Sequence, residues 1–184
     1  MKAFLGRRKT PLLEIILIAA VIAIDQVSKY LIQLYLSPVG ASLPLINGIF
    51  QLTNAHNTGA AWGLLPGFRW MFIPLTILVC AAIVFVLIRF HKKLCVFSRI
   101  TLALLLAGAV GNLVDRIALS YVRDMFDFCL INFPVFNVAD SSLTIGCILL
   151  VVDALFLKDR SIFERVSFSK KSETTKPVGD GGDA

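Results

Sequence analysis

The chain has 184 residues, of which 57% are hydrophobic and 16% are charged, and its mean hydropathy is +0.81. Soluble domains carry about a quarter charged residues, so this composition excludes an ordinary soluble globular protein and indicates that a membrane is the solvent. The net charge of +6 does not predict nucleic-acid binding, because the basic residues lie at the ends of apolar segments, as in proteins oriented across a membrane.

Four apolar segments are long enough to cross about 30 Å of hydrocarbon, which takes about 20 residues. They are Leu12–Leu31, Met71–Phe90, Ile100–Leu119 and Val138–Leu157. All but four of the 18 Lys and Arg lie before the first segment, around the link between the second and third, or after the fourth. By the positive-inside rule, we expect both termini in the cytoplasm and the two other links outside.

The first predicted span contains an acid and a base near its outer end. Asp25 and Lys29 are four residues apart, so they lie on one face of a helix. Ionisable groups at membrane depth cost about 2.5 kcal/mol or more, so they mark a functional site unless they neutralise each other. Both interpretations, a structural ion pair and a direct role, stay open for this pair.

The link between the first two spans, residues 37–68, is long for a helix connection, and long loops are usually functional or disordered. Within it, Asn47-Gly48 stands between two apolar segments. This pattern predicts a tight hairpin with positive φ at both central residues, and hence a small β-sheet on the outer surface. After the sheet, Ala60–Leu65 is expected to lie along the membrane interface, with Trp62 at headgroup depth.

The third span carries Asn112 and Arg116 on one helical face, with Asp115 beside them. Gly108 and Gly111 permit the close approach of another helix. Arg116 has a second interpretation, because a long basic side chain near the end of a span can extend to the headgroups.

Two more acids, Asp124 and Asp127, follow the third span among aromatic residues. Acids in loops are usually only solvated. The fourth span opens with Asn137, a favourable N-cap, and Asp140 falls in its first turn, where the helix dipole favours an anion. Helix capping alone would therefore account for these last two residues.

The alternating directions of the spans bring these polar clusters to one depth. At 1.5 Å per residue, Asp25 and Asn112 lie about 18–20 Å from the cytoplasmic ends of their spans. Asp140 approaches the same level from the outside. Because independent caps and ion pairs need not converge, we predict a single polar site in the outer leaflet of an all-α membrane protein, with four transmembrane helices and a small extracytoplasmic β-hairpin or sheet between spans one and two.

The residue types limit the chemistry of such a site. The chain has no HExxH or GxSxG motif, its two His fall on opposite sides of the membrane, and its four Cys are scattered without a CxxC pair. We therefore expect no zinc site, no serine-hydrolase active site and no disulfide framework. Two aspartates held close share a proton, so one acts as a base on water while the other polarises a carbonyl. This is aspartic peptidase chemistry, although spacing alone does not distinguish it from an ion pathway.

The motifs together resemble those of the lipoprotein signal peptidases, the bacterial type II signal peptidases. The resemblance extends from the first span to the fourth. It rests on five motifs in order: Asp25–Lys29, Asn57–Ala61, Gly111–Arg116, Val122–Asp124 and Phe136–Ser141. The departures are small: Trp62 stands where the family more often has Phe, and His56 precedes the asparagine motif.

The resemblance implies an aspartic endopeptidase that removes signal peptides from diacylglyceryl-modified prolipoproteins by cutting before the lipidated cysteine. It implies a multi-pass protein of the bacterial cytoplasmic (inner) membrane, with the active site toward the extracytoplasmic leaflet. Its partners are those substrates and membrane lipids; it needs no metal or organic cofactor, and we expect a monomer. One peptidase domain is predicted over residues 1–168, and the Gly-, Pro-, Ser- and Thr-containing residues 169–184 predict a disordered cytoplasmic tail.

The resemblance also implies roles for individual residues. The catalytic pair matches Asp124 and Asp140. Positions associated with substrate or inhibitor contact and with support of the pair match Asn57, Gly59, Asn112, Arg116 and Asn137. Positions of structural support match Asp25, Lys29 and Asp115.

The physical pattern favours the same two acids. Asp115 adjoins Arg116, whose charge would keep it ionised and make it a poor partner for sharing a proton. Asp127 lies three residues beyond Asp124 and is expected to turn toward water. A proton-coupled transporter component and a structural membrane subunit are the alternatives, and both are disfavoured because the acids crowd into one leaflet.

Overall fold

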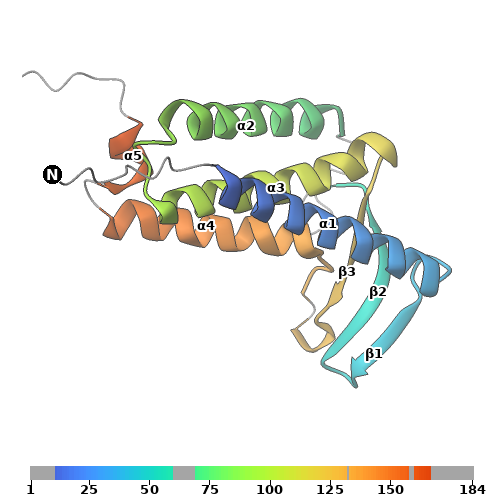
Figure 1. The fold of residues 1–184 in the computed structure, drawn as a ribbon. Helices are drawn as coiled ribbons and strands as arrows, with labels where there is room; N and C mark the ends of the chain where they lie inside the picture. The colour runs from blue at the N-terminus through green and yellow to red at the C-terminus, as the bar shows by residue number, and fades with distance from the viewer. Residues whose placement is uncertain (1–10, 60–68, 132, 158–159, 167–184) are drawn as a thin grey trace, which may run out of the picture.

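The computed structural model of the chain describes residues 11–59, 69–131, 133–157 and 160–166. Four helices in these residues are long and apolar enough to cross a membrane. They are α1 (Leu12–Tyr35), α2 (Arg69–Phe90), α3 (Val96–Ala118) and α4 (Val138–Phe156). Helices α1 and α3 run toward a small sheet, and α2 and α4 run back from it (Figure 1). The expected fold class, helical with four spans and a small sheet, is confirmed.

Two helices extend four residues past one end of their predicted apolar segments. Helix α1 continues four residues beyond Leu31, and α3 starts four residues before Ile100. At the start of α3, the Cys95 Sγ accepts a hydrogen bond from Ser98 N, which caps the helix. Hydropathy marks where a helix meets lipid, whereas backbone hydrogen bonding and caps decide where it ends, so the two boundaries differ.

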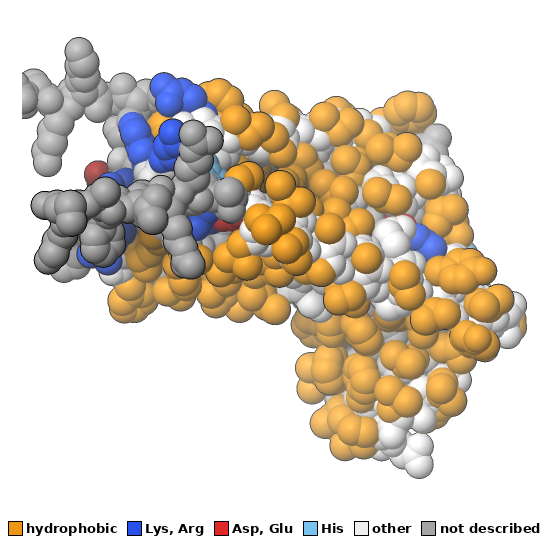
Figure 2. Space-filling view, viewed as in Figure 1, with side chains coloured by type: hydrophobic (Ala, Val, Ile, Leu, Met, Phe, Trp, Pro, Cys, Tyr) orange, Lys and Arg blue, Asp and Glu red, His pale blue; other side chains and the backbone are white. Residues whose placement is uncertain are grey.

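Helix α3 is the most buried of the four and packs against the other three. A Cβ at Gly108 would collide with the backbone oxygen of Ala139, and one at Gly111 would lie 2.8 Å from Asp25 Oδ2. These two glycines therefore allow α3 to approach α4 and α1 closely. Apolar side chains cover the outward surface of the helices (Figure 2), as expected where lipid replaces water.

The sheet at one end of the helices has three antiparallel strands in the order β1 (Ser42–Ile46), β2 (Phe50–Asn57) and β3 (Val122–Asp127). The hairpin predicted at Asn47-Gly48 joins β1 to β2, but its turn has three residues, and only Gly48 has a positive φ, +71°. The expectation of positive φ at both central residues is wrong. Ile49 N donates to Ile46 O at 3.0 Å, which closes a four-residue turn from Ile46 to Ile49. Such a turn needs a positive φ only at its third residue, which is Gly48.

Strand β3 was not expected, because its two acids suggested a solvated loop. It pairs with β2 so that Ala55 lies opposite Asp124 and Gln51 lies opposite Asp127. The short 3-10 helix η2 (Cys129–Ile131) follows it. Pairing with β2 fixes the segment that leaves α3, so Asp124 has a defined position.

At the opposite end of the helices, the short helix α5 (Ile162–Arg165) packs against α4. The fully buried Asp153 joins three elements there: it accepts hydrogen bonds from Ser98 Oγ at 2.5 Å and from Ile162 N at 2.6 Å. The segment around Trp62 and residues 169–184, about which we made sequence predictions, lie outside the described residues.

Candidate active site

A buried lysine connects α1 to α3 close to the sheet. Lys29 Nζ lies 2.8 Å from Asp25 Oδ2 and 3.3 Å from Asp115 Oδ2, and all three side chains are fully buried. Lys29 also donates to Asn112 Oδ1 at 3.1 Å. Asp25 and Lys29 are therefore not an isolated pair, because their charges are shared with a second helix.

Asp25 also reaches the start of α4. Its Oδ1 accepts a hydrogen bond from Ala139 N at 2.9 Å, in the first turn of the helix. The first backbone N–H groups of a helix have no partners within the helix and carry partial positive charge, so a carboxylate is favourable there. Asp25 thus ties α1 to the end of α4 that carries Asp140.

The start of α4 is closed by a reciprocal pair of hydrogen bonds. Asn137 Oδ1 accepts from Asp140 N at 2.8 Å, and Asp140 Oδ2 accepts from Asn137 N at 3.2 Å. The capping geometry expected from the sequence is confirmed. The cap uses only Oδ2 of Asp140. The other carboxylate oxygen, Oδ1, accepts a hydrogen bond from Asn112 Nδ2 at 2.7 Å, and Asp140 also lines a cavity.

Asp124 lies on β3 with 3% of its surface exposed. Its Oδ1 accepts a hydrogen bond from Asn137 Nδ2 at 2.7 Å, and its side chain also bonds to Asn57. Burial, with the nearby charge of Asp140, raises the pKa of Asp124 to about 7, although the bonds from Asn137 and Asn57 and the charge of Lys29 oppose this. Asn137 therefore holds both aspartates, one through its side-chain amide and one through its backbone N–H.

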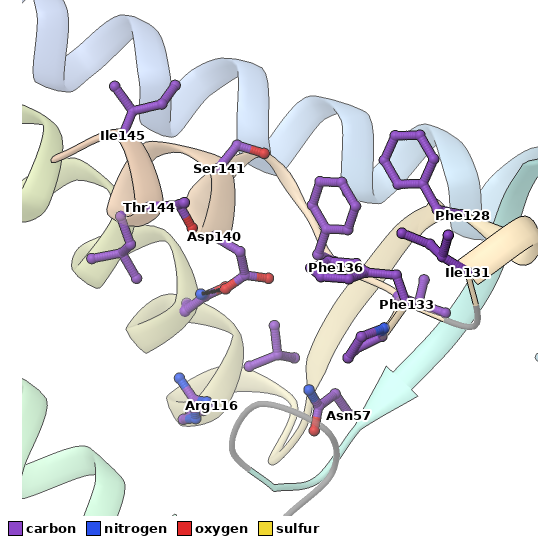
Figure 3. Close-up of a pocket in the computed structure, with 15 residues that line it drawn as sticks. Asn57, Arg116, Phe128, Ile131, Phe133, Phe136, Asp140, Ser141, Thr144 and Ile145 are labelled. Carbon is purple, nitrogen blue, oxygen red and sulfur yellow. Dashed lines mark hydrogen bonds between the residues drawn. The ribbon is translucent and has the colours of Figure 1, made fainter. Parts of the chain in front are cut away.

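The cavity beside this pair has a volume of about 640 Å³. In Figure 3, Asn57, Arg116 and Asp140 point into one side of it, and aromatic side chains form another side. The apolar lining includes Phe128, Ile131, Phe133, Phe136 and Ile145. Asp124 is not among the lining residues, but it is hydrogen-bonded to Asn57, which lines the cavity.

Arg116 does not extend away from the protein to the headgroups. It lines the cavity and donates through Nη2 to Gly59 O at 3.3 Å. Its Cζ lies 5.4 Å from the centre of the Phe72 ring. Gly59 is held in turn by its N–H, which donates to Asn57 Oδ1 at 2.9 Å. The basic group and the Asn57–Gly59 turn therefore belong to one wall.

Asp115 has two ion partners that the sequence did not suggest. We expected the charge of the adjacent Arg116 to keep Asp115 ionised, and the two charges do interact, but the direct ion contacts of Asp115 are with Lys29 and with Arg123, the latter at 2.6 Å. On a helix, neighbouring residues point in different directions, so Arg116 faces the cavity while Asp115 faces the interior. Asp115 is thus held in an ion network rather than beside the pair.

Asp127 does not turn freely toward water. Its Oδ2 accepts hydrogen bonds from Gln51 Nε2 at 2.7 Å and from Thr53 Oγ1 at 3.0 Å, both on β2. Because side chains alternate along a strand, three residues are enough to send Asp124 and Asp127 to opposite faces of β3. Asp127 is therefore kept away from Asp140 by the sheet.

A second buried charged cluster lies at the far end of the helices, and the sequence analysis did not identify it. Arg99 Nη1 contacts Glu14 Oε1 at 2.7 Å and bonds to His91 Nε2 at 2.8 Å. An acid within a predicted span was the signal that would have found it. The acids therefore do not crowd into one leaflet only, which corrects that expectation.

The two clusters are not continuous along α3. Between them the helix buries apolar side chains, among them Ala103, Leu106 and Ala107. Within the described parts of the chain, no group of three or more His, Cys, Asp or Glu is placed to hold a metal ion. His56 instead stacks on Tyr121, with ring centres 3.8 Å apart.

Comparison with known proteins gives consistent matches. The family model described as Signal peptidase (SPase) II matches residues 17–156. A lipoprotein signal peptidase of Brevibacillus brevis is 49% identical over 137 residues, which are 73% of this chain and 89% of that protein. One of Lactiplantibacillus plantarum is 39% identical over 141 residues, 77% of this chain and 93% of that protein.

Two solved structures, each described as a bacterial membrane enzyme, have the same fold. The first is 36% identical with a TM-score of 0.69, over 85% of this chain and 93% of that one. The second is 37% identical with a TM-score of 0.68, over 78% of this chain and 92% of that one.

Proposed function

The chain belongs to the signal peptidase II family, and we propose that it is an aspartic endopeptidase that cuts diacylglyceryl-modified prolipoproteins immediately before the lipidated cysteine. A member of this family is a bacterial membrane peptidase that removes signal peptides from prolipoproteins. The observation that supports the aspartic mechanism is the joint binding of Asp124 and Asp140 by Asn137 beside the cavity.

In the proposed reaction, one aspartate is ionised and its partner protonated. The ionised group takes a proton from a water molecule, whose oxygen attacks the carbonyl carbon, while the protonated group gives its proton to the carbonyl oxygen. In the resulting diol, one hydroxyl returns a proton to the second aspartate as the C–N bond breaks, and the first aspartate protonates the leaving nitrogen. The products are a signal peptide with a new carboxyl group and a lipoprotein with a free amino group on its cysteine.

The other polar residues are assigned to binding and support. Arg116, Asn57 and Gly59 form the wall that would orient the substrate backbone, since they present a guanidinium, an amide and a backbone turn. For Asp124 to reach the peptide, the bond between Asn57 and Asp124 must open or be shared with the substrate. Asn112 and Asn137 hold the two acids in place, and Asp25, Lys29 and Asp115 fix the helices behind them.

The position of the site suits a substrate that stays in the membrane. The apolar aromatic lining of the cavity continues to exposed side chains such as Leu130 and Ile131, so a signal helix and lipid chains could reach the acids without entering water. Most of the Lys and Arg side chains visible in Figure 2 lie at the end of the helices away from the sheet. This supports cytoplasmic termini and a site in the extracytoplasmic leaflet. We propose a monomer in contact with membrane lipids as the working form.

The test is cleavage of a purified diacylglyceryl-modified prolipoprotein by aspartate variants. Asp124→Asn and Asp140→Asn keep the size of the side chain but remove the acid, so each should bind substrate and leave it uncut. Asp127→Asn is the matched control on the same strand and should retain substantial cleavage. Mass spectrometry of the product reports which bond is cut.

The opposite pattern would end the assignment. An inactive Asp127→Asn with a fully active Asp124→Asn would mean that the dyad is misassigned, and loss of activity in EDTA with rescue by zinc would refute the aspartic mechanism. A proton-coupled transporter component is disfavoured because the described part of α3 buries apolar residues between the two charged clusters.

A further inference from the structure

Arg123 lies beside Asp124, and its side chain is bonded to two helices, α1 and α3. Its Nη2 and Nε donate to the two carboxylate oxygens of Asp115 at 2.6 and 3.2 Å, and its backbone N donates to Asp115 Oδ2 at 3.0 Å. On α1, its Nη2 donates to Gln26 Oε1 at 2.8 Å and its Nη1 to Gln33 Oε1 at 3.3 Å. The side chain is 13% exposed. This is a built arrangement, because a planar guanidinium meets a carboxylate through two parallel bonds.

These bonds fix the backbone immediately before Asp124. The carbonyl oxygen of Arg123 accepts from Asn137 Nδ2 at 3.3 Å, and the same amide donates to Asp124 Oδ1 at 2.7 Å. The side chain of Arg123 therefore anchors the start of β3 to α1 and α3. Its carbonyl oxygen is hydrogen-bonded to Asn137, which binds both Asp124 and Asp140. Arg123 does not line the cavity.

Arg123 also balances charge in the buried network. The network contains two carboxylates, Asp25 and Asp115, and Lys29 balances only one of their two charges. Arg123 supplies the second positive charge. His56 on β2 also lies near Arg123, and Tyr121 stacks on this histidine. The charged groups that face the aspartate pair from other elements are Asp25 and Lys29 on α1 and Arg116 on α3. The charge of Arg123 reaches beyond Asp115, because burial and then this charge lower the pKa of His56.

We propose that Arg123 is a positioning residue of the aspartate pair, which fastens Asp124 in register with Asp140 and keeps the network behind the pair neutral. The inference rests on the proposed aspartic mechanism. It assigns a function in catalysis to a side chain that contacts neither substrate nor the reacting atoms.

The test compares the pH dependence of kcat and KM in Arg123→Met and Arg123→Lys. Without Arg123, the charge of Asp115 offsets more of the charge of Lys29, and Lys29 is the cation that favours the ionised form in the pair. Ionisation of the base therefore becomes harder, so in Arg123→Met the acid limb of kcat should move up by about one pH unit. KM should stay within about twofold, since Arg123 is outside the cavity. Arg123→Lys keeps the charge but loses the two parallel bonds, so its acid limb should stay in place while kcat falls several-fold.

Arg99→Met is the matched control, because Arg99 also holds a buried carboxylate, that of Glu14 at 2.7 Å, but at the other end of the helices. It should lower thermal stability and leave the pH profile unchanged. His56→Gln, made in the parent and in Arg123→Met, removes the other group that titrates in this range, and the shift should persist. An unchanged profile in Arg123→Met, or the same shift in Arg99→Met, overturns the inference.

The inference can fail separately from the proposed function. If Asp124→Asn and Asp140→Asn are inactive while Arg123→Met and Arg123→Lys have the parent kcat and profile, only the role of Arg123 is wrong. If the aspartate variants cleave normally, the proposed mechanism is wrong. If Arg123→Met does not fold, Arg123→Lys decides: a parent kcat overturns the inference, and a several-fold loss with the parent KM and acid limb supports it.

Discussion

At the scale of single residues, Asn137 connects the capping of α4 to the state of Asp124. Its Oδ1 accepts from Asp140 N, and its Nδ2 donates to Asp124 Oδ1. Hydrogen bonds to a carboxylate favour the charged form, whereas burial and a neighbouring acid favour the neutral form. At Asp124 burial and Asp140 outweigh the hydrogen bonds, and its pKa rises to about 7.

This raised pKa predicts how stability depends on pH. The folded state holds the proton of Asp124 more tightly than the unfolded chain does, so Asp124 should make the protein less stable as pH rises from about 4 to about 7, with little further change above. The loss is at most about 1.4 kcal/mol per pH unit. Thermal unfolding in detergent of Asp124→Asn and of the parent should show the variant gaining relative stability between pH 5 and pH 8.

The same group should shape the activity profile. A working dyad needs one proton, so cleavage should decline as pH rises past about 7, with an apparent constant that belongs to both acids together.

A difference in stability between Asp124→Asn and the parent that does not change with pH would show that Asp124 is ionised throughout.

At the scale of elements, the packing of α3 on α4 decides where Asp140 lies. Gly108 leaves no room for a Cβ, because one would collide with the backbone oxygen of Ala139 and lie 2.8 Å from Leu143 Cγ. Ala139 immediately precedes Asp140, so the closeness of the two helices also sets the distance from Asp140 to Asn112. Sequence indicated this close approach from the glycines, but not which helix they meet.

Gly108→Ala should therefore impair both stability and catalysis. Overpacking of this kind costs about 1–3 kcal/mol, and a displaced Asp140 should reduce cleavage by roughly tenfold or more. Val114→Leu adds the same single carbon to an exposed position of α3 and should leave both unchanged. The unfolding temperature and kcat of both variants test this prediction. A Gly108→Ala enzyme with the unfolding temperature and kcat of the parent would show that α4 is free to move away from α3.

At the scale of the whole molecule, two buried charged clusters occupy opposite ends of the helices. One contains the aspartates beside the sheet, and the other joins Glu14 to Arg99. Nearby, Asp153 fastens α5 to the helices. Most of the basic side chains visible in Figure 2 lie at that second end, as the positive-inside rule expects if this end faces the cytoplasm.

This arrangement predicts the accessibility of each end. In a variant whose four natural Cys are replaced by Ser, a Cys at the exposed Ser42 of β1 should react with an impermeant thiol reagent added to intact cells whose outer envelope has been opened. A Cys at the exposed Glu164 of α5 should react only after the cytoplasmic membrane is broken. Reaction of Glu164→Cys but not Ser42→Cys would reverse the orientation.

The sequence by itself determined the four spans, because the transfer of apolar segments into lipid depends on local composition, and it identified the polar residues that stand at one depth. Only the tertiary structure decided which of them meet. Asp25 reaches the backbone of Ala139, which is 114 residues away, and Asp115 pairs with Arg123 rather than its neighbour Arg116. Strand β3 forms because β2 supplies a pairing edge, which no local pattern around Asp124 reveals. Partners in a packed site depend on the approach of separate helices and strands, so their contacts follow from packing geometry rather than from spacing along the chain.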